Sequence, residues 1–345
     1  MDQAIDKKKK DLLGNTRCVS DFEKIAEIGE GTYGTVYKAR DKLTGEIVAL
    51  KKVRMHNESD GFPITSLREI NILSTLKHHP NIINLKEVVV GYKKESVFLA
   101  FEYCEADLAI LVDYLNRKKK EVPYFNLAEI KSLILQLLKA VAYLHDHDIL
   151  HRDLKLSNLL INSKGHLKLA DFGLARRIGY PLSHYTPKVV TLWYRSPEIL
   201  LRHPQGYSKP ADAWGIGCIL AELLNFGRPI MPGNNEIDQF KHMARLLGKP
   251  NVWQGFEKVE NSKHLATLVG EYRYNTIGDR FESMSDSCLE LLKGLLEWDP
   301  DERLTINEAL IHPFFTEHPL PVRSEEIKCL RYLPDTINSF VKPKQ

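Results

Sequence analysis

Short apolar runs rich in β-branched residues fill the first hundred positions and predict strands. The clearest are residues 47–50 (IVAL) and 88–90 (VVV). One helix interrupts them, because leucine or isoleucine recurs every three positions across residues 67–76. The pattern therefore predicts a small β-rich lobe that contains a single helix.

Beyond residue 107 the apolar spacing changes to that of helices. Leucine, isoleucine and valine alternate steps of three and four across residues 127–144, which predicts an amphipathic helix. Asn126, with Glu129 three positions later, predicts a capping box at its start. Residues 214–224 are almost continuously apolar, which is typical of a helix buried on all sides. A larger helical lobe therefore follows the β-rich one.

The predicted fold class is α+β, with an antiparallel-β N-lobe at about 22–102, a hinge at 102–107 and a mainly helical C-lobe at 108–315. Residues 1–21 show no periodicity and are expected to form a flexible basic tail, and residues 316–345 a C-terminal tail. Lys7 to Lys10 are open to three interpretations: an import signal, a contact for acidic surfaces, or a solvated terminus.

Composition excludes several classes of protein. With 43% hydrophobic and 27% charged residues, the 345-residue chain is neither disordered nor collagenous. A net charge of +3 is too small to argue for direct nucleic-acid binding. The five cysteines lack the Cys-x-x-Cys pairing of a zinc site. No apolar run approaches the ~18 residues of a membrane span, and the lysine-rich N-terminus is not a secretory signal. We expect a soluble, intracellular protein.

Residues 29–36 fit the pattern G-x-G-x-x-G-x-V, reading Gly29, Glu30, Gly31, Thr32, Tyr33, Gly34, Thr35, Val36. Glycines let a backbone approach phosphate oxygens closely and offer N–H donors. The pattern alone is weak, and a dinucleotide-binding fold would need a helix directly after it. A strand follows instead, which favours a hairpin flap over ATP phosphates.

Lys51 ends the strand Val48-Ala49-Leu50-Lys51, which matches V-A-I-K with one conservative change. An amine on the inner face of a strand needs an acidic partner, since an unpaired buried charge is costly. Glu69 lies four residues before Leu73, on the same helical face. We predict that Lys51 and Glu69 form an ion pair.

The strongest signal is the run from His151 to Asn158, which matches H-R-D-L-x-x-x-N and is followed by Asp171-Phe172-Gly173. Asn158 and Asp171 offer the oxygen ligands that Mg²⁺ prefers. Asp153 would orient an attacking hydroxyl and accept its proton. Lys155 would neutralise charge on a transferred phosphoryl group. These residues predict phosphoryl transfer.

With all these motifs in order, residues 22–315 resemble a eukaryotic protein kinase, which implies the bilobal kinase fold. Residues 63–69 read PITSLRE and resemble the regulatory helix of the PITSLRE-type cyclin-dependent kinases. A sister group of transcription-linked cyclin-dependent kinases shares Thr-Pro-Lys ahead of the paired valines at 189–190. The choice between these subfamilies stays open.

The resemblance implies ATP and Mg²⁺ as cofactors, with ATP held between the lobes. Phe101 would close the rear of the adenine pocket, Glu102 and Cys104 would bond adenine through their backbones, and Asp107 could reach the ribose. A reactive thiol at Cys104 is the alternative. The remaining implied ATP-binding residues are Ile28, Gly29, Glu30, Gly31, Thr32, Tyr33, Gly34, Val36, Ala49, Lys51, Tyr103, Asn158 and Asp171.

The resemblance also implies how the molecule is regulated. Thr186 would be phosphorylated by an activating kinase, and Arg68, Arg152 and Arg176 would receive the phosphate. The other implied positions are an inhibitory phosphorylation pair, Thr32 and Tyr33, and a pocket for the proline that follows the target residue, Val190 and Arg195.

The same resemblance implies two structural contacts, and the sequence departs from the family pattern at one position. Glu198 and Arg303 match an ion pair that anchors the activation segment, and Asp212 is expected to brace the catalytic loop. Ser196 stands where alanine is usual, and its hydroxyl could bond to nearby backbone.

The function predicted from these motifs is a cyclin-regulated serine/threonine kinase that acts on Ser-Pro and Thr-Pro sites. A cyclin, with the L-type expected, would dock at the PITSLRE helix. The nucleus is favoured over the cytoplasm, with a role in transcription, RNA processing or the cell cycle. The alternatives are a kinase-fold scaffold without catalysis and a small-molecule phosphotransferase.

Overall fold

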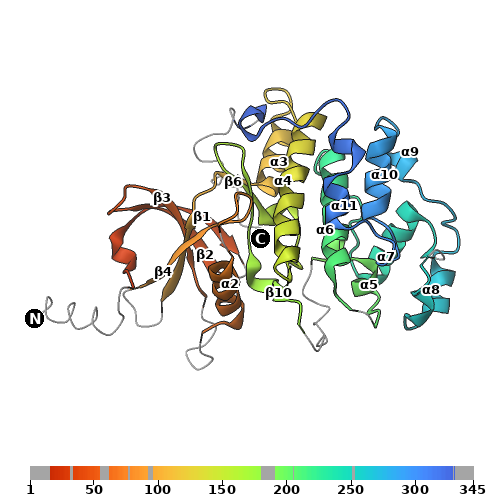
Figure 1. The fold of residues 1–345 in the computed structure, drawn as a ribbon, viewed down its shortest axis with the longest axis horizontal. Coiled ribbons are helices and arrows are strands. Elements are labelled where there is room, and N and C mark those ends of the chain that lie inside the picture. The colour runs from red at the N-terminus through yellow and green to blue at the C-terminus, as the bar shows by residue number, and fades with distance from the viewer. Residues whose placement is uncertain are drawn as a thin grey trace, which may run out of the picture.

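The computed structural model describes residues 16–31, 34–54, 62–76, 78–91, 96–179, 191–204, 206–250, 253–328 and 330. A β-sheet lobe lies at one end of the molecule and a helical lobe at the other, as Figure 1 shows. The chain passes from one to the other at the short strand β6 (Ala106–Asp107). The predicted α+β, two-lobed architecture is confirmed.

The N-lobe is a five-stranded antiparallel sheet in the order β1-β2-β3-β5-β4. Its core side chains, which include Ala39, Val48, Leu50 and Ala100, are buried together because alternate strand positions face one side. The bounds are β1 Phe22–Gly31, β2 Gly34–Asp41, β3 Ile47–Lys52, β4 Leu85–Val90 and β5 Val97–Glu102.

The α-helix found among the described residues of the N-lobe, α2 (Ile64–Thr75), carries most of the PITSLRE string. It buries Ile72, Leu73 and Glu69, whereas Ile64 and Leu67 are 71% and 52% exposed. The helical prediction is confirmed, and Leu67 lies on the solvent side of the helix.

The C-lobe consists mainly of helices, and α6 (Lys209–Leu224) runs through its centre with residues 211–223 buried. Helix α4 (Leu127–Asp146) begins at Asn126, whose side chain accepts from the Glu129 N–H while the Glu129 carboxylate accepts from the Asn126 N–H. The predicted buried helix and the predicted capping box are therefore confirmed. The other helices are α3 Leu108–Arg117, α5 Pro197–Leu200, α7 Glu236–Leu247, α8 Ser262–Leu268, α9 Ile277–Arg280, α10 Asp286–Leu295 and α11 Ile306–Leu310.

Two small sheets lie at the junction of the lobes and hold the loops that carry the motifs. One has the order β6-β8-β9 and the other pairs β10 with β7. Their bounds are β7 Ile149–Leu150, β8 Leu159–Ile161, β9 Leu167–Leu169 and β10 Arg176–Arg177. The His-Arg-Asp run therefore lies between β7 and β8, and the Asp-Phe-Gly run between β9 and β10.

The tail predicted for residues 1–21 is wrong at its inner end. Arg17 binds Asp41 through two hydrogen bonds of 2.7 and 2.8 Å and also binds Glu87 at 3.0 Å. The Val90 N–H donates to the Arg17 carbonyl, so this segment pairs with the edge strand β4. Residues 17–21 therefore belong to the N-lobe, held to its sheet by the ion pairs of Arg17.

The tail predicted for residues 316–345 is also wrong at its inner end. The Glu317 carbonyl accepts from the buried Lys131 ammonium at 3.0 Å, and the Glu129 carboxylate accepts from the Lys328 N–H at 2.7 Å. Ile327 is 2% exposed. Residues 317–328, which we name the C-terminal strap, thus pack against the start of α4. No helix within the described ranges is long and apolar enough to cross a membrane.

Candidate active site

Lys51 on β3 and Glu69 on α2 meet in the N-lobe. The Lys51 Nζ lies 2.8 and 3.0 Å from the two carboxylate oxygens of Glu69, and 3.8 Å from Oδ1 of Asp171. Burial raises the pKa of Glu69, and the Lys51 ammonium opposes that rise. The ion pair predicted from the shared faces of strand and helix is present.

The catalytic-loop side chains converge on the carboxylate of Asp153. Lys155 Nζ lies 2.7 Å from its Oδ2, and the Asn158 amide donates to the same oxygen at 2.9 Å. Thr191 adds a further contact, since its hydroxyl donates to Asp153 Oδ1 at 3.5 Å and accepts from Lys155 at 3.2 Å. Asp153, 2% exposed, is held in one orientation by these donors.

Asp171 and Asn158 fit a divalent cation. Asp171 adopts a left-handed backbone (φ 63°), and its buried Oδ1 accepts no hydrogen bond from the residues that the structure describes. The Asn158 amide donates to the Asp153 carbonyl at 2.7 Å as well as to its carboxylate, so its Oδ1 is left as a ligand. No cluster of three His, Cys, Asp or Glu side chains suited to a metal occurs in the described part of the chain. Two oxygen ligands suit Mg²⁺ that is shared with substrate phosphates rather than caged by protein.

Asp212, near the start of α6, braces the catalytic loop as predicted. Its carboxylate accepts from the backbone N–H groups of His151 and Arg152, each at 3.0 Å, and from the Tyr207 hydroxyl at 2.9 Å. His145 Nε2 lies 3.0 Å away. Burial alone would raise the pKa of Asp212, but the His145 side chain and these donors hold it below its usual value. They also stabilise the left-handed backbone of Arg152 (φ 72°).

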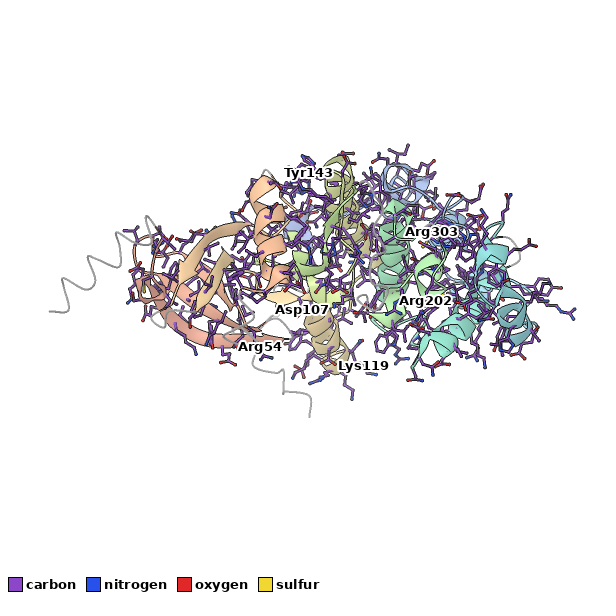
Figure 2. All side chains as sticks on the ribbon, turned by 90° about the horizontal axis from the view of Figure 1, so that it is seen from below. Arg54, Asp107, Lys119, Tyr143, Arg202 and Arg303 are labelled. Atoms are coloured by element: carbon purple, nitrogen blue, oxygen red, sulfur yellow. The ribbon has the colours of Figure 1, made fainter. Side chains whose placement is uncertain are left out.

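The predicted hinge residues line the passage between the lobes. Phe101 is 7% exposed and lies opposite Ala49 in the β3–β5 pair. Burial raises the pKa of the Cys104 thiol, which disfavours the reactive-thiol alternative. Figure 2 places Asp107 at the junction. Asp107 accepts from the Ile110 N–H and caps α3, and burial raises its pKa to about 6.

Lys168 contributes a hinge contact that sequence reasoning missed. Its Nζ lies 2.9 Å from Glu102 Oε1, which also accepts from the Asn84 N–H at 2.8 Å. The signal available in the sequence was a lysine three positions before the Asp of Asp-Phe-Gly, inside an apolar strand. Sequence reasoning also missed Thr191, although it directly follows Val190, which was assigned to the pocket for the substrate proline.

The described glycine-rich residues lie at the end of β1 and at the start of β2. Gly31 pairs with Gly34, and Val36 pairs with Lys51 in the next strand. A Cβ added to Gly34 (φ 140°) would lie 1.9 Å from the Lys52 carbonyl oxygen, so only glycine fits there. Ile28, Gly29 and Glu30 lie in β1. Thr32 and Tyr33 lie outside the described residues.

The three predicted phosphate-receiving arginines all bind the backbone after Asp171. Arg68 donates to the Gly173 carbonyl at 2.9 Å, Arg152 to Leu174 at 3.4 Å and Arg176 to Ala175 at 2.9 Å. Burial, and then the nearby Arg152 charge, lower the pKa of Arg68. Such a concentration of positive charge favours an anion. Thr186 lies outside the described residues.

The segment after position 190 is anchored by two ion pairs. Arg303 binds both carboxylate oxygens of Glu198 at 2.9 Å, which confirms the predicted pair. Arg195 lies 3.2 Å from Glu236 Oε1, and burial lowers the pKa of Arg195. The buried Ser196 hydroxyl has no hydrogen-bond partner among the described residues, so the predicted backbone contact is not found in that part of the chain. Val190 lies outside the described residues.

Comparison with known sequences gives one consistent result. A profile of the protein kinase domain matches residues 22–315. The chain is 50% identical, over 94% of its length and 86% of the other's, to the probable cyclin-dependent kinase 10 of Dictyostelium discoideum. It is 49% identical to cyclin-dependent kinase 10 of Homo sapiens, over 91% and 84% of the two chains. It is 48% identical to cyclin-dependent kinase G-2 of Oryza sativa, over 90% of this chain and 43% of that protein.

Proposed function

This chain belongs to the protein kinase family, among the cyclin-dependent serine/threonine kinases, and on that premise we propose that it transfers the ATP γ-phosphate to serine or threonine residues followed by proline when a cyclin is bound. The observation that carries the proposal is the set of contacts around Asp153. Phosphoryl transfer needs positioned charge more than covalent chemistry, and these contacts supply positioned charge.

Asp153 would orient the substrate hydroxyl and accept its proton. The Lys155 ammonium and the Asn158 amide, both on Oδ2, hold the carboxylate fixed. The Thr191 hydroxyl lies near the other oxygen, Oδ1, at 3.5 Å. Lys155 would also neutralise charge on the phosphoryl group in transit.

Mg²⁺, bound with ATP, would be held by Asn158 and Asp171 and would neutralise phosphate charge. Lys51 would bind the ATP phosphates, and Glu69 keeps it pointed into the site. Kinases require this lysine–glutamate pair and the metal-binding Asp to be in place together. Two contacts support the proposal: Lys51 Nζ lies 2.8 Å from Glu69 Oε2, and Asp171 Oδ1 lies 3.8 Å from the same nitrogen.

The N-lobe helix offers a surface for a cyclin. Ile64 and Leu67 on α2 are 71% and 52% exposed, while Glu69, two positions after Leu67, is buried. A partner that covers this apolar face would fix the orientation of α2 and hence of Glu69. The L-type cyclin is supported by the PITSLRE resemblance alone.

Phosphorylation of Thr186 by an activating kinase is the second proposed control. A phosphothreonine carries about −1.5 to −2 charges and orders a loop through arginines. Arg68 belongs to α2, Arg152 to the catalytic loop and Arg176 to β10. A phosphate held by all three would join these parts of the molecule.

The preference for proline rests on Val190 and Arg195. A substrate site that offers no acceptor for a backbone N–H discriminates in favour of proline. The Arg195 guanidinium is buried against Glu236, which fixes the backbone that follows position 190.

The test is transfer of labelled phosphate from Mg-ATP to a Ser-Pro peptide. We expect signal from the chain with its cyclin, a loss of about 10²-fold or more in Asp153→Asn, and no loss in the matched exposed variant Asp113→Asn. A peptide with alanine in place of the proline should react at least about tenfold more slowly. Activity without any cyclin would overturn the cyclin requirement.

The same assay separates the alternatives. If no phosphate is transferred with any member of a cyclin panel, after Thr186 has been phosphorylated, the result would favour a kinase-fold scaffold. Transfer to a sugar or drug but not to the peptide would favour a small-molecule phosphotransferase. We propose a nuclear role in transcription, RNA processing or the cell cycle, which localisation of the tagged full-length chain would test.

A further inference from the structure

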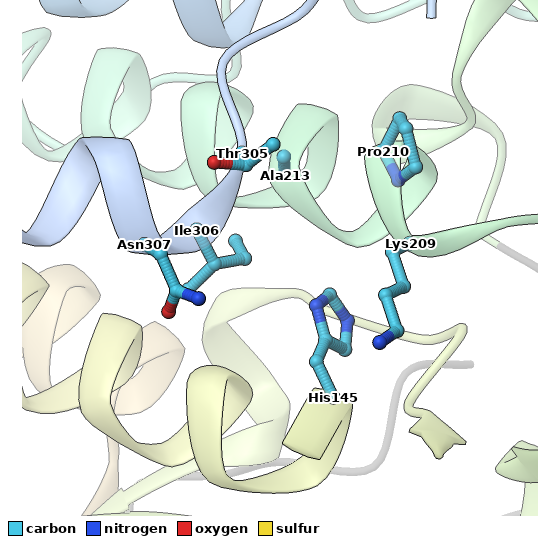
Figure 3. Close-up of a pocket in the computed structure, with 7 residues that line it drawn as sticks. All are labelled: His145, Lys209, Pro210, Ala213, Thr305, Ile306 and Asn307. Carbon is cyan, nitrogen blue, oxygen red and sulfur yellow. The ribbon is translucent and has the colours of Figure 1, made fainter. Parts of the chain in front are cut away.

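A cavity of about 200 Å³ lies in the C-lobe between the end of α4, the start of α6 and the start of α11 (Figure 3). It is separate from the cluster around Asp153. The residues that line it are His145, Lys209, Pro210, Ala213, Thr305, Ile306 and Asn307.

The wall of this cavity is apolar on one side and carries two basic side chains, Lys209 and His145, on the other. Pro210, Ala213 and Ile306 give the apolar side, and Ala213 and Ile306 are 1% and 4% exposed. Lys209 and His145 project into the space from α6 and α4 in Figure 3. None of the seven lining residues carries a carboxylate. Ligand sites commonly combine an apolar body with a few placed polar groups.

Both basic side chains retain capacity for a ligand. Lys209 forms a long ion pair with Asp148, whose Oδ1 lies 4.0 Å from Nζ, and the two side chains are 47% and 72% exposed. Such a pair is weak, and an ammonium has three donors. His145 uses Nε2 toward Asp212, and its Nδ1 has no hydrogen-bond partner among the described residues.

The cavity is connected to the catalytic loop through one residue pair. His145 contacts Asp212 Oδ2, and the same oxygen accepts from the His151 N–H. A carboxylate bound beside Nδ1 would restrict the imidazole ring and with it the contact of Nε2 with Asp212. A ligand in the cavity therefore acts on the group that fixes the loop backbone.

We propose that this cavity binds a small aryl carboxylate, with its ring against Ile306 and Ala213 and its carboxylate between Lys209 and His145, and that occupancy rigidifies the catalytic loop through Asp212. The size is suitable, since an apolar cavity of roughly 150 Å³ holds one benzene ring. The proposal concerns binding and does not depend on kinase activity.

The experiment uses 4-fluorobenzoate as the probe and the full chain as the receptor, with fluorine NMR of the ligand as the readout. We expect saturable binding with a Kd of about 1 mM or below, and weaker binding of the uncharged 4-fluorobenzamide. Lys209→Met should weaken benzoate binding about tenfold. Asn307→Trp, at an exposed position on the cavity wall, should block entry. Lys263→Met, an exposed lysine on α8, is the matched control and should bind as the unmodified chain does.

Equal binding by Lys209→Met and Lys263→Met, or no saturation by about 10 mM, would overturn the site. The link to the loop has its own readout, which is amide hydrogen exchange of the peptide that contains His151 and Arg152. Saturating benzoate should slow that exchange severalfold in the Lys263→Met protein and leave it unchanged in Asn307→Trp. Unchanged exchange in both proteins would overturn the link.

Discussion

Single buried polar groups in this molecule differ mainly in whether they have a partner. Asp153 and Asp212 each accept several hydrogen bonds. The Ser196 hydroxyl, in a residue 1% exposed, neither accepts from nor donates to any residue that the structure describes. A buried hydroxyl without a partner costs about 1–3 kcal/mol. At the residue scale, the free energy of unfolding therefore depends on whether each buried polar atom has a hydrogen-bond partner.

Replacing Ser196 with alanine should therefore raise the free energy of unfolding by about 1 kcal/mol. Urea unfolding of the two proteins measures the difference. Ser285→Ala is the matched control with the opposite sign, because the Ser285 Oγ accepts from the Cys288 N–H and contacts Glu317. A loss of stability in Ser196→Ala would show that the hydroxyl has a partner after all.

Glu222 makes stability depend on pH. Burial raises its pKa to about 7, although the Tyr194 hydroxyl donates to it at 2.6 Å. Because the folded state holds this proton more tightly than the unfolded state, stability should fall as pH rises from about 4.5 to about 7. Glu222→Gln should remove about 2 kcal/mol of that fall. Urea unfolding at the two ends of the range measures it, with the exposed Glu257→Gln as control; parallel curves for Glu222→Gln and the unmodified chain would contradict the assignment.

Among the elements, short strands at the lobe junction position more of the site than the long helices do. Strand β9 carries Lys168, which reaches Glu102 at the end of β5, and two residues after β9 comes Asp171. One strand thus joins Glu102, which is proposed to bind adenine, to Asp171, which is proposed to bind the metal. Substitutions in β9 should therefore weaken ATP binding more than they slow phosphoryl transfer.

Lys168→Met should raise the KM for ATP several-fold with a smaller change in kcat, because Glu102 loses its cation and the hinge loses a fixed point. The free energy of unfolding should also fall by about 2 kcal/mol, since one partner of a largely buried pair remains. Lys168→Arg should restore most of the KM. Lys86→Met, whose partner Glu46 is 61% exposed, serves as control. A drop in kcat alone would contradict the positioning role.

At the scale of the whole molecule, both ends of the described chain fasten onto a lobe. Arg17 binds the edge of the sheet, and the C-terminal strap covers the start of α4. Lys131 is 0% exposed, and its ammonium contacts the Glu317 carbonyl and carboxylate and the Phe314 ring. The strap therefore satisfies a charge that lies inside the C-lobe.

Ending the chain at Thr316 should destabilise it by about 3 kcal/mol or more, because the Lys131 ammonium stays buried without its oxygen partners. Thermal unfolding in the presence and absence of ATP measures the loss. Lys131→Met in the shortened chain should recover part of it. A chain ended at Leu330, which keeps these contacts, is the control; equal stability of the two shortened chains would contradict the role of the strap.

The sequence predicted what short-range pattern and charge pairing determine. Spacing identified α4 with its Asn126 cap, and facing positions identified the pair of Lys51 and Glu69. The contacts of Arg17 and of the strap join positions far apart in the chain, and no local pattern marks them. The hydroxyl of Ser196 was expected to bond to nearby backbone, but within the described ranges it has no hydrogen-bond partner.

Asp212 receives two donors on each carboxylate oxygen: His145 and the His151 N–H on Oδ2, and the Arg152 N–H and Tyr207 on Oδ1. A carboxylate has about four such acceptor positions, so none is left over. Asparagine would place its two amide hydrogens opposite two of these donors. Glutamate, one methylene longer, would place its oxygens beyond both pairs of donors. No single substitution preserves all four contacts. We therefore expect Asp212 to tolerate replacement less well than its neighbours do.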